Sequence, residues 1–161
     1  MTEFRKLLRY EPKTGQFFWR ISPNRRVKAG DVAGSKNRGY VLIRVSGKLI
    51  LAHRLAWFFV TGRWPKRELD HRNGRRDDNR FQNLREATHA QNQQNRTATK
   101  RSKSGHVGVF WDGRREHWFA QIRADGKQHY LGSHETVEDA AAAYRAAKAR
   151  LHSFNPEVRH A

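Results

Sequence analysis

Short runs of large apolar side chains in the first half of the chain predict several strands and one helix. Residues 15–20 read GQFFWR and predict a strand, and the runs YVLIRV and KLILAH, joined by Ser46–Gly47, predict a β-hairpin. Apolar residues from His53 to Thr61 are too dense for a single helical stripe. They predict a short helix that is buried on most sides and ends at Gly62.

The second half of the chain has a different pattern. The runs VGVFW, HWFAQIR and KQHYLG predict three short antiparallel strands, with the turn Asp125–Gly126 between the second and third. Thr136, followed three residues later by Asp139, predicts the start of a helix over residues 137–152. This helix is rich in alanine, so its axis can lie close to the sheet.

The predicted fold class is therefore α+β, in two modules with a connection between them. Residues 93–104 read QQNRTATKRSKS and contain no large apolar side chain, which indicates a linker. We place the first domain at residues 1–95, a basic linker at 96–104 and the second domain at 105–155. The first combines a β-hairpin region with the strands and helix around residue 70, and the second is a three-stranded sheet on one helix.

The net charge of the chain indicates the class of partner that it binds. The chain has 161 residues and a formal net charge of +18, from 33 Lys and Arg against 15 Asp and Glu. The excess lies in residues 1–104, whereas residues 105–161 carry 8 basic and 7 acidic residues. A polyanion is the expected partner, nucleic acid before an anionic membrane. In the linker, Lys100, Arg101 and Lys103 are expected to lie along the phosphate backbone.

Composition also excludes several kinds of chemistry. The chain has no cysteine, which removes disulfides, thiol nucleophiles and Cys-ligated zinc, so no zinc is expected. No apolar run is long enough to span a membrane, and the first residues contain no apolar export segment. We expect an intracellular protein, a monomer or weak dimer, without a membrane or a small-molecule cofactor.

The most informative stretch runs from residue 69 to residue 95. Asp70–His71 follows an apolar residue and precedes the turn pair Asn73–Gly74, so it is expected at the end of a strand facing a cleft. A returning strand is expected after Asn83, and a capping pair at Thr88 predicts a helix that begins at His89.

These polar residues suit a hydrolytic metal site. Asp70 offers an anionic oxygen and Asn92 a neutral one, which are ligands suited to Mg²⁺ or a similar cation such as Mn²⁺. His71 can accept a proton from water near neutral pH. Asn95 is the alternative to Asn92 as a ligand. His53 is expected to satisfy a backbone group near the core, with a catalytic role as the less favoured alternative. The arginines expected to contact phosphate are Arg72, Arg75 and Arg85.

The order and spacing of Asp70–His71, Asn83–Leu84–Arg85 and Asn92 resemble the HNH nucleases, specifically the homing-endonuclease branch of phages and introns. The resemblance covers residues 4–95. It implies a ββα-metal module in which His71 is the general base, Asp70 binds the metal and Asn83 holds the loop that carries the base. The family's usual third residue is histidine, and this chain has Asn92 there. The resemblance further implies a phage protein that acts in the host cytoplasm.

Residues 104–151 resemble the plant Apetala-two, or ethylene-response-factor, DNA-binding domain. Matching pieces include Gly108–Val109, Trp118 and Leu131–Gly132. The resemblance implies a sheet that lies in the major groove of double-stranded DNA. Phe110 and Gln128 stand where plant members carry arginine, so the plant target does not carry over. Trp118 is expected in the core, and the expected DNA contacts are Trp111, Arg114, Arg115, Gln121, Arg123 and Tyr130.

The expected function is that of a metal-dependent DNA endonuclease of homing type, with a C-terminal module that reads sequence. The alternative is a non-catalytic DNA-binding regulator whose HNH pocket has decayed. Retention of Asp70, His71 and Asn83 together favours the enzyme.

Overall fold

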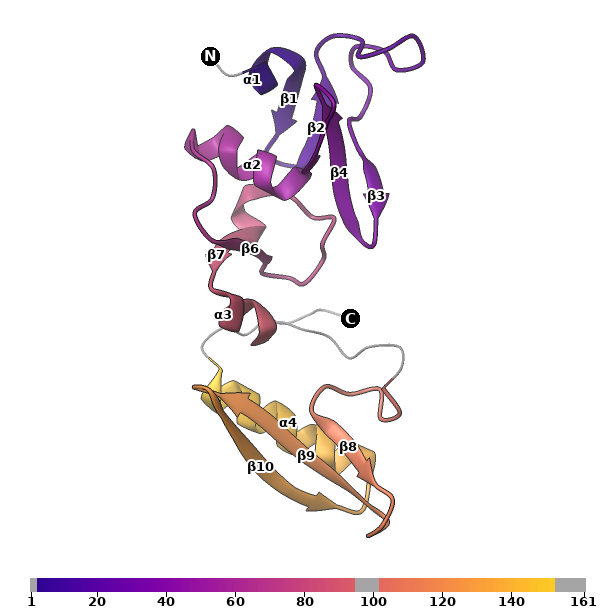
Figure 1. The fold of residues 1–161 in the computed structure, drawn as a ribbon, viewed down its shortest axis with the longest axis vertical. Helices are drawn as coiled ribbons and strands as arrows, with labels where there is room; N and C mark the ends of the chain where they lie inside the picture. Colours follow the sequence, from indigo (N-terminus) through magenta and orange to yellow (C-terminus); the bar gives the residue numbers. More distant parts are fainter. Residues whose placement is uncertain (1–2, 95–101, 153–161) are drawn as a thin grey trace. The chain divides into compact units, whose positions relative to one another are not determined.

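The computed structural model describes residues 3–94 and 102–152, and the chain divides into two compact units between His89 and Ala90. Figure 1 shows the order of the elements. The boundary predicted at residue 95 therefore falls a few residues after the division of the contacts. Most of the predicted linker, with Asn95, Lys100 and Arg101, lies outside the described residues. Within the described residues, no helix is long and apolar enough to cross a lipid bilayer.

The first unit contains small antiparallel sheets and short helices. Two two-stranded sheets are formed by β1 with β2 and by β6 with β7, and β3, β4 and β5 form a three-stranded sheet. Its elements are α1 (Glu3–Leu7), β1 (Leu8–Glu11), β2 (Gln16–Trp19), β3 (Ser35–Asn37), β4 (Tyr40–Val45), β5 (Lys48–Leu51), α2 (Ala52–Thr61), β6 (Glu68–His71), the 3₁₀ turn η1 (Phe81–Asn83) and β7 (Leu84–Ala87). The short helix α3 (His89–Gln94) follows, and the division between the units falls after its first residue.

One hydrophobic core joins the N-terminal strands to the region around β6 and β7. Leu8 and Phe17 from the first hairpin, Ile43 from β4, Leu55 from α2 and Leu84 from β7 are all buried in it. Partly buried aromatic rings extend the core outward, and burial of such large rings is how a chain of low hydrophobic content gains its stability. The core therefore fixes β7, and through β7 its partner β6.

The predictions for this unit are confirmed where the hydrophobic pattern was strong. The predicted strand, the β-hairpin and the helix after it match β2, the β4–β5 pair and α2, and Gly62 ends α2 with a φ of 76°. The structure adds α1, β1 and β3, which the sequence did not indicate. All three residues of β3 are exposed, so no hydrophobic alternation marked it.

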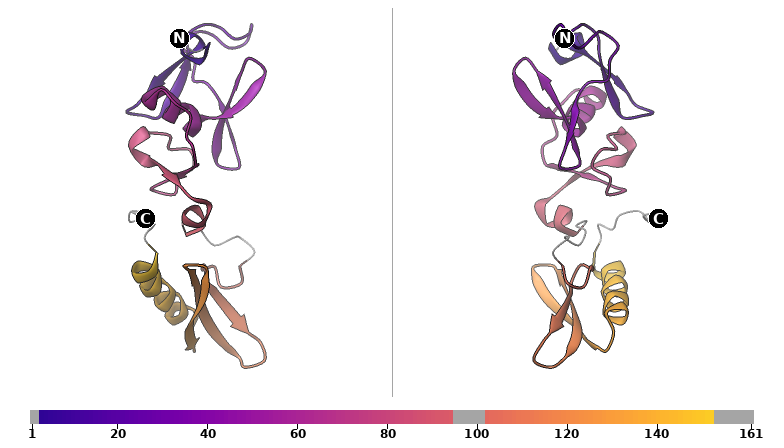
Figure 2. Two further views of the ribbon diagram at one scale, coloured as in Figure 1. Left: turned by 60° about the vertical axis from the view of Figure 1, so that its left-hand side comes forward. Right: turned by 90° about the vertical axis from the view of Figure 1, so that its right-hand side faces the viewer.

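The second unit has one three-stranded antiparallel sheet with the order β10-β9-β8 and one long helix. Its bounds are β8 (Val109–Asp112), β9 (His117–Ala124), β10 (Lys127–His134) and α4 (Val137–Leu151). Figure 2 shows α4 along one face of this sheet. Thr136 caps α4 by accepting a hydrogen bond from the backbone N–H of Asp139, as predicted.

Small residues bring α4 close to the sheet. Ala140, Ala141 and Ala147 of α4 are buried, and the first two form a core with Val109 of β8 and Ala120 of β9. The predicted close approach of an alanine-rich helix is thus confirmed. Trp118 packs against the same cluster, which agrees with its predicted place in the core.

Candidate functional site

The pair Asp70–His71 occupies the last two positions of β6, as the sequence predicted for the end of a strand. Antiparallel pairing sets Asp70 opposite Arg85 and His71 opposite Leu84 on β7. Both side chains are buried, with 5% and 4% of their surface exposed. Arg85 donates hydrogen bonds from Nε and a terminal nitrogen to Oδ2 of Asp70, each at 2.9 Å. Arg85, predicted to contact phosphate, is therefore engaged with the predicted metal ligand.

His71 lies among aromatic rings. Its ring centroid is 5.1 Å from that of His53, edge to face, and 6.2 Å from that of Tyr40. Burial lowers the pKa of His71, although the contact with Asn79 and the nearby carboxylates of Asp70 and Asp78 raise it. The imidazole is therefore neutral near pH 7, which is the form that can accept a proton.

His53 completes this cluster of rings. It is the second residue of α2, and 5% of its surface is exposed. Its Nδ1 has no hydrogen-bond partner within the described residues. Burial, reinforced by the neighbouring His71 and Arg54, lowers the pKa of His53 to about 3. The expectation that this histidine satisfies a backbone group is not supported at Nδ1. The residue packs instead against the predicted base.

Asn83 closes the loop between β6 and β7. Its Oδ1 accepts a hydrogen bond from the backbone N–H of Asn73 at 3.0 Å, and its Nδ2 donates to the carbonyl of Asp78 at 2.8 Å. Its own carbonyl accepts from the N–H of Arg72 at 2.8 Å. Since this one buried side chain bonds the start and the middle of the loop, it fixes the segment that follows His71.

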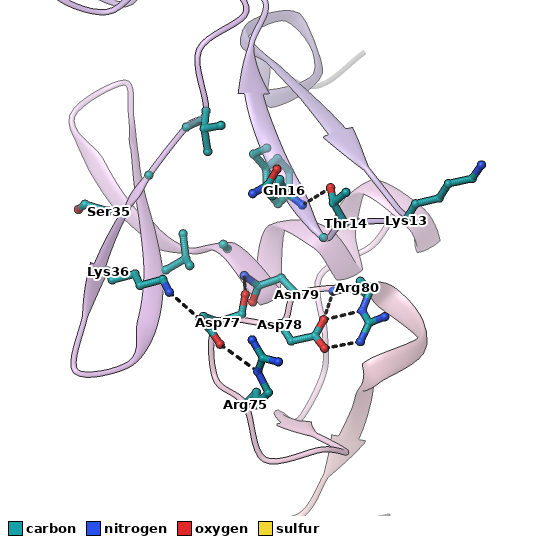
Figure 3. Close-up of a pocket in the computed structure, with 17 residues that line it drawn as sticks. Lys13, Thr14, Gln16, Ser35, Lys36, Arg75, Asp77, Asp78, Asn79 and Arg80 are labelled. Carbon is teal, nitrogen blue, oxygen red and sulfur yellow. Dashed lines mark hydrogen bonds and ion pairs between the residues drawn. The ribbon is translucent and has the colours of Figure 1, made fainter. Parts of the chain in front are cut away.

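Two carboxylates stiffen the same loop. Asp78 accepts hydrogen bonds from Arg80 and from Asn73 Nδ2, and the Arg80 contact lowers its pKa. Asp77 binds Lys36 Nζ at 2.7 Å, and this contact lowers its pKa despite partial burial. Figure 3 shows the pair of Asp78 with Arg80, within the loop, and the pair of Asp77 with Lys36, which ties the loop to β3.

A pocket of about 560 Å³ lies between the turn after β1, the strands β3 and β4, and this loop. Asn79 lines the pocket and also places its Oδ1 3.4 Å from Nε2 of His71. The pocket thus borders the residue that contacts the predicted base. Its basic lining residues are Lys13, Lys36, Arg75 and Arg80. Arg75 is exposed there, as a phosphate contact requires.

A divalent metal needs several oxygen or nitrogen donors around it, from side chains or from waters. Among the described residues, no three His, Cys, Asp or Glu side chains come together as a metal cage. Asp70 still offers a hard, buried oxygen, which fits Mg²⁺ because this ion retains several waters and uses few protein ligands. Asn92 lies on α3, past the point where the chain divides into its two units.

In the second unit, three of the six predicted contact residues, Gln121, Arg123 and Tyr130, share one face of the sheet. Gln121 pairs with Tyr130, and Arg123 pairs with Gln128, so these side chains point away from α4. Arg114 and Arg115 are exposed in the turn between β8 and β9, and Lys103 is exposed before β8. Trp111, which was also predicted to contact DNA, does not lie on this face.

The register places Trp111 on the opposite face from the other predicted contacts. It is paired with Trp118, and the two ring centroids are 5.1 Å apart. Phe110 and Phe119 occupy the face with Gln121 instead.

Several residues at the site had no separate signal in the sequence. Tyr10 donates a hydrogen bond to the carbonyl of Asn79 from a position 69 residues earlier in the chain, and Tyr40 approaches from β4. Asn73 and Asp78 are turn-forming residues, and that property was the available clue to the loop's internal bonds. Contacts such as those of Tyr10 depend on tertiary packing.

Fold and site together define a nuclease module, and residues 51–94 match the family model described as HNH endonuclease. Over 94 residues the chain is 34% identical to Protein 3.8 of Escherichia phage T7, a match that covers 58% of this chain and 78% of the relative. The chain therefore belongs to the family of this phage protein and carries an HNH endonuclease domain. No solved structure matches the chain.

Proposed function

We propose that this protein is a metal-dependent DNA endonuclease of homing type that acts on double-stranded DNA in the cytoplasm of an infected host. The observation that carries the proposal is the buried, neutral His71 at the end of β6, inside the region that matches the HNH family and beside the carboxylate of Asp70. We take β6, β7 and α3 to form the ββα-metal module.

In the proposed reaction, His71 removes a proton from a water that attacks phosphorus in line with the leaving 3′ oxygen. If Nε2 carries the proton and donates it to Asn79 Oδ1, the lone pair that accepts a proton is on Nδ1. Asn83 holds the following loop, and so it orients His71 without touching the substrate.

Asp70 and Asn92 would hold a divalent ion such as Mg²⁺, with Asn95 as the alternative to Asn92, and this ion would stabilise charge on the phosphate and the leaving oxygen. Arg75, beside the pocket, would contact phosphate together with Arg72. Arg85 would contact phosphate only after release from Asp70.

The second unit would supply sequence recognition as a domain of the Apetala-two type. Support comes from its three-stranded sheet, whose uncovered face carries Gln121, Arg123 and Tyr130. Lys100, Arg101 and Lys103 of the linker would add contacts to the phosphate backbone. A two-stranded or wider ribbon fits the major groove, where each base pair presents a distinct pattern.

Two observations favour the alternative of a non-catalytic DNA-binding regulator. The ion pair with Arg85 neutralises Asp70, and the described residues contain no group of three ligands typical of a closed metal site. In that case DNA would bind without being cut.

The decisive experiment is incubation of the full-length protein with supercoiled plasmid in Mg²⁺ or in EDTA, followed by separation of intact, nicked and linear forms. We expect conversion in Mg²⁺ alone. His71→Ala should abolish conversion and leave DNA affinity within about twofold, because it removes the base and no phosphate contact. His106→Ala is the matched control, since it removes an exposed imidazole of the second unit. Absence of conversion with every divalent ion would leave the regulator as the function.

A further inference from the structure

The face of the β8–β10 sheet that points away from α4 carries a line of aromatic side chains, one from each strand. Phe110 pairs directly with Phe119, and Tyr130 lies diagonally beyond it, opposite Gln121. The ring centroids of Phe110 and Phe119 are 5.5 Å apart, and those of Phe119 and Tyr130 are 6.3 Å apart. We call Phe110, Phe119 and Tyr130 the aromatic ridge.

The fold does not need this ridge for its core. The core of the second unit is on the other face, where Val109 and Ala120 pack against α4. Phe110 is 44% exposed and Tyr130 is 61% exposed. Figure 2 shows that α4 covers one face of the sheet. Continuous apolar area left open on a small unit marks a contact surface.

The residues beside the ridge favour a polyanion as its occupant. Arg123 shares the face, and Arg114 and Arg115 follow β8 in the turn, whereas Lys127 pairs with the buried Ala124 and so lies on the α4 side of the sheet. Within the described residues none of these four cations forms an ion pair with a carboxylate, although Arg115 lies near enough to Asp112 to contribute to lowering its pKa. Free cations around an apolar strip match phosphates around bases rather than the surface of an average protein.

The arrangement of the rings favours duplex DNA over unpaired bases. Phe110 and Phe119 stack on each other with an interplanar angle of 26°, and Tyr130 is tilted by 33° from Phe119. The faces of Phe110 and Phe119 are turned toward each other, whereas a platform for unpaired bases presents its ring faces to the ligand. Such a ridge offers apolar edges to small groups on a groove floor.

We propose that the aromatic ridge contacts the 5-methyl groups of thymines in the major groove, which makes the second unit selective for A·T base pairs. The inference deepens the proposed function and rests on the sheet binding duplex DNA. The thymine methyl is the apolar group that this groove presents, and aromatic side chains can pack on it. Gln121 and Gln128 lie on the same face, and glutamine can bond N6 and N7 of the paired adenine.

The test removes the methyl group and leaves base pairing intact. Binding of the full-length protein is measured, in EDTA, to a 30-base-pair duplex of alternating dA and dT and to the same duplex with dU in place of dT. We expect tighter binding to the dT duplex by about fourfold for each buried methyl, so roughly tenfold or more for two or three contacts. Equal affinity for the two duplexes would overturn the inference.

Variants assign the effect to the ridge. The double variant Phe110→Ala and Tyr130→Ala should bind both duplexes with equal affinity, while Tyr130→Phe keeps the apolar edge and should keep the preference. Leu49→Ala removes a side chain that is 52% exposed on the first unit, and it is the matched control for loss of an exposed apolar group. Thermal unfolding curves that coincide with the wild type show that the ridge variants are folded.

Other outcomes separate this inference from the nuclease. If the ridge variants keep the full preference for dT, DNA shape causes it and the inference fails. If single-stranded dT of the same length binds more tightly than the duplex, the ridge stacks unpaired bases and the inference also fails. Both results leave plasmid cleavage and its dependence on His71 untouched, so the proposed enzyme can stand while the inference falls.

Discussion

His71 and His53 are buried to a similar extent, but their surroundings give them different expected roles. His71 has Asn79 and three carboxylates near it, all of which favour its protonated form and partly offset burial. Protonation of His53 is disfavoured by its burial and by the neighbouring side chains of His71 and Arg54. A buried neutral imidazole stabilises the fold only while the solution does not force a proton onto it.

We therefore predict that the first unit loses stability in weak acid. The pKa of His53 is about 3 in the folded chain, below about 6.5 in the unfolded chain, so only the unfolded chain binds the proton between these values. This contribution is complete above pH 6.5 and is lost as the pH falls. At pH 5 the loss is about 2 kcal/mol, from 1.36 kcal/mol for each pH unit.

Urea unfolding at pH 7.5 and pH 5 measures this loss. His53→Phe keeps a ring in the same place and cannot titrate, so it should reduce the difference between the two pH values by about that amount. The exposed-site control His106→Ala should show the wild-type difference. A His53→Phe protein with an unchanged pH dependence would mean that other groups cause the acid sensitivity.

At the scale of elements, the loop from Arg72 to Asn83 is an ordered connection rather than a loose one. Its order comes from bonds that Asn83, the last residue of the loop, makes to the backbone of Arg72, Asn73 and Asp78. Such bonds let a segment without regular structure keep a fixed position next to a reacting group.

Replacing Asn83 with Ala should therefore affect cleavage more than binding. The change leaves the Asn73 N–H and the Asp78 carbonyl without their partner, and we expect a loss of about 2 kcal/mol in the free energy of unfolding. Because the loop no longer positions His71, plasmid nicking should fall at least tenfold, while DNA affinity changes by less than threefold. Asn24→Ala is the control, since Asn24 makes similar local bonds in an exposed turn. Equal loss of nicking in both variants would show that general destabilisation is responsible.

The elements also show what a sequence can predict here. Strong local signals identified the β4–β5 hairpin, α2 and the cap of α4, because hydrophobic period, turn residues and capping chemistry act over a few positions. The positions of Asp70, His71 and Asn83 followed from motif spacing. The polar strand β3 and the side of the sheet on which Trp111 lies depend on pairing between distant segments, and the short runs did not determine them.

At the scale of the whole molecule, net charge is divided unequally between the two parts of the sequence. Residues 1–104 carry 25 basic and 8 acidic residues, a net charge of +17, and residues 105–161 carry a net charge of +1 from 8 basic and 7 acidic residues. Diffuse attraction to DNA belongs to the first part. Base contacts, if they are made as proposed, belong to the second.

Deletion of residues 105–161 should therefore reduce specificity more than affinity. The slope of log affinity against log salt is about −0.9 for each neutralised phosphate, and a chain that keeps nearly all the basic excess should keep most of the slope. We expect it to nick DNA in Mg²⁺ at many positions and the full-length protein to nick at few.

Mapping of cut positions on a long duplex, together with binding at two salt concentrations, measures both quantities. A version of the full-length protein with the ridge changes Phe110→Ala and Tyr130→Ala is the matched control, because it keeps every charge. If residues 1–104 cut with undiminished selectivity, the first part of the chain reads the sequence.

The contact between the first hairpin and the loop from Arg72 to Asn83 also limits how the HNH domain can be exchanged between genomes. A side chain at Gly15, whose φ is 74°, would place its Cβ 2.4 Å from the backbone nitrogen of Arg80. Tyr10 bonds the same stretch at Asn79, and Leu8 and Phe17 share a core with Leu84. The family match begins only at residue 51, yet the loop it contains is shaped by residues that precede it. Recombination that moved the matched segment alone would remove the core residues that precede it, so a transferred segment needs the N-terminal hairpin as well.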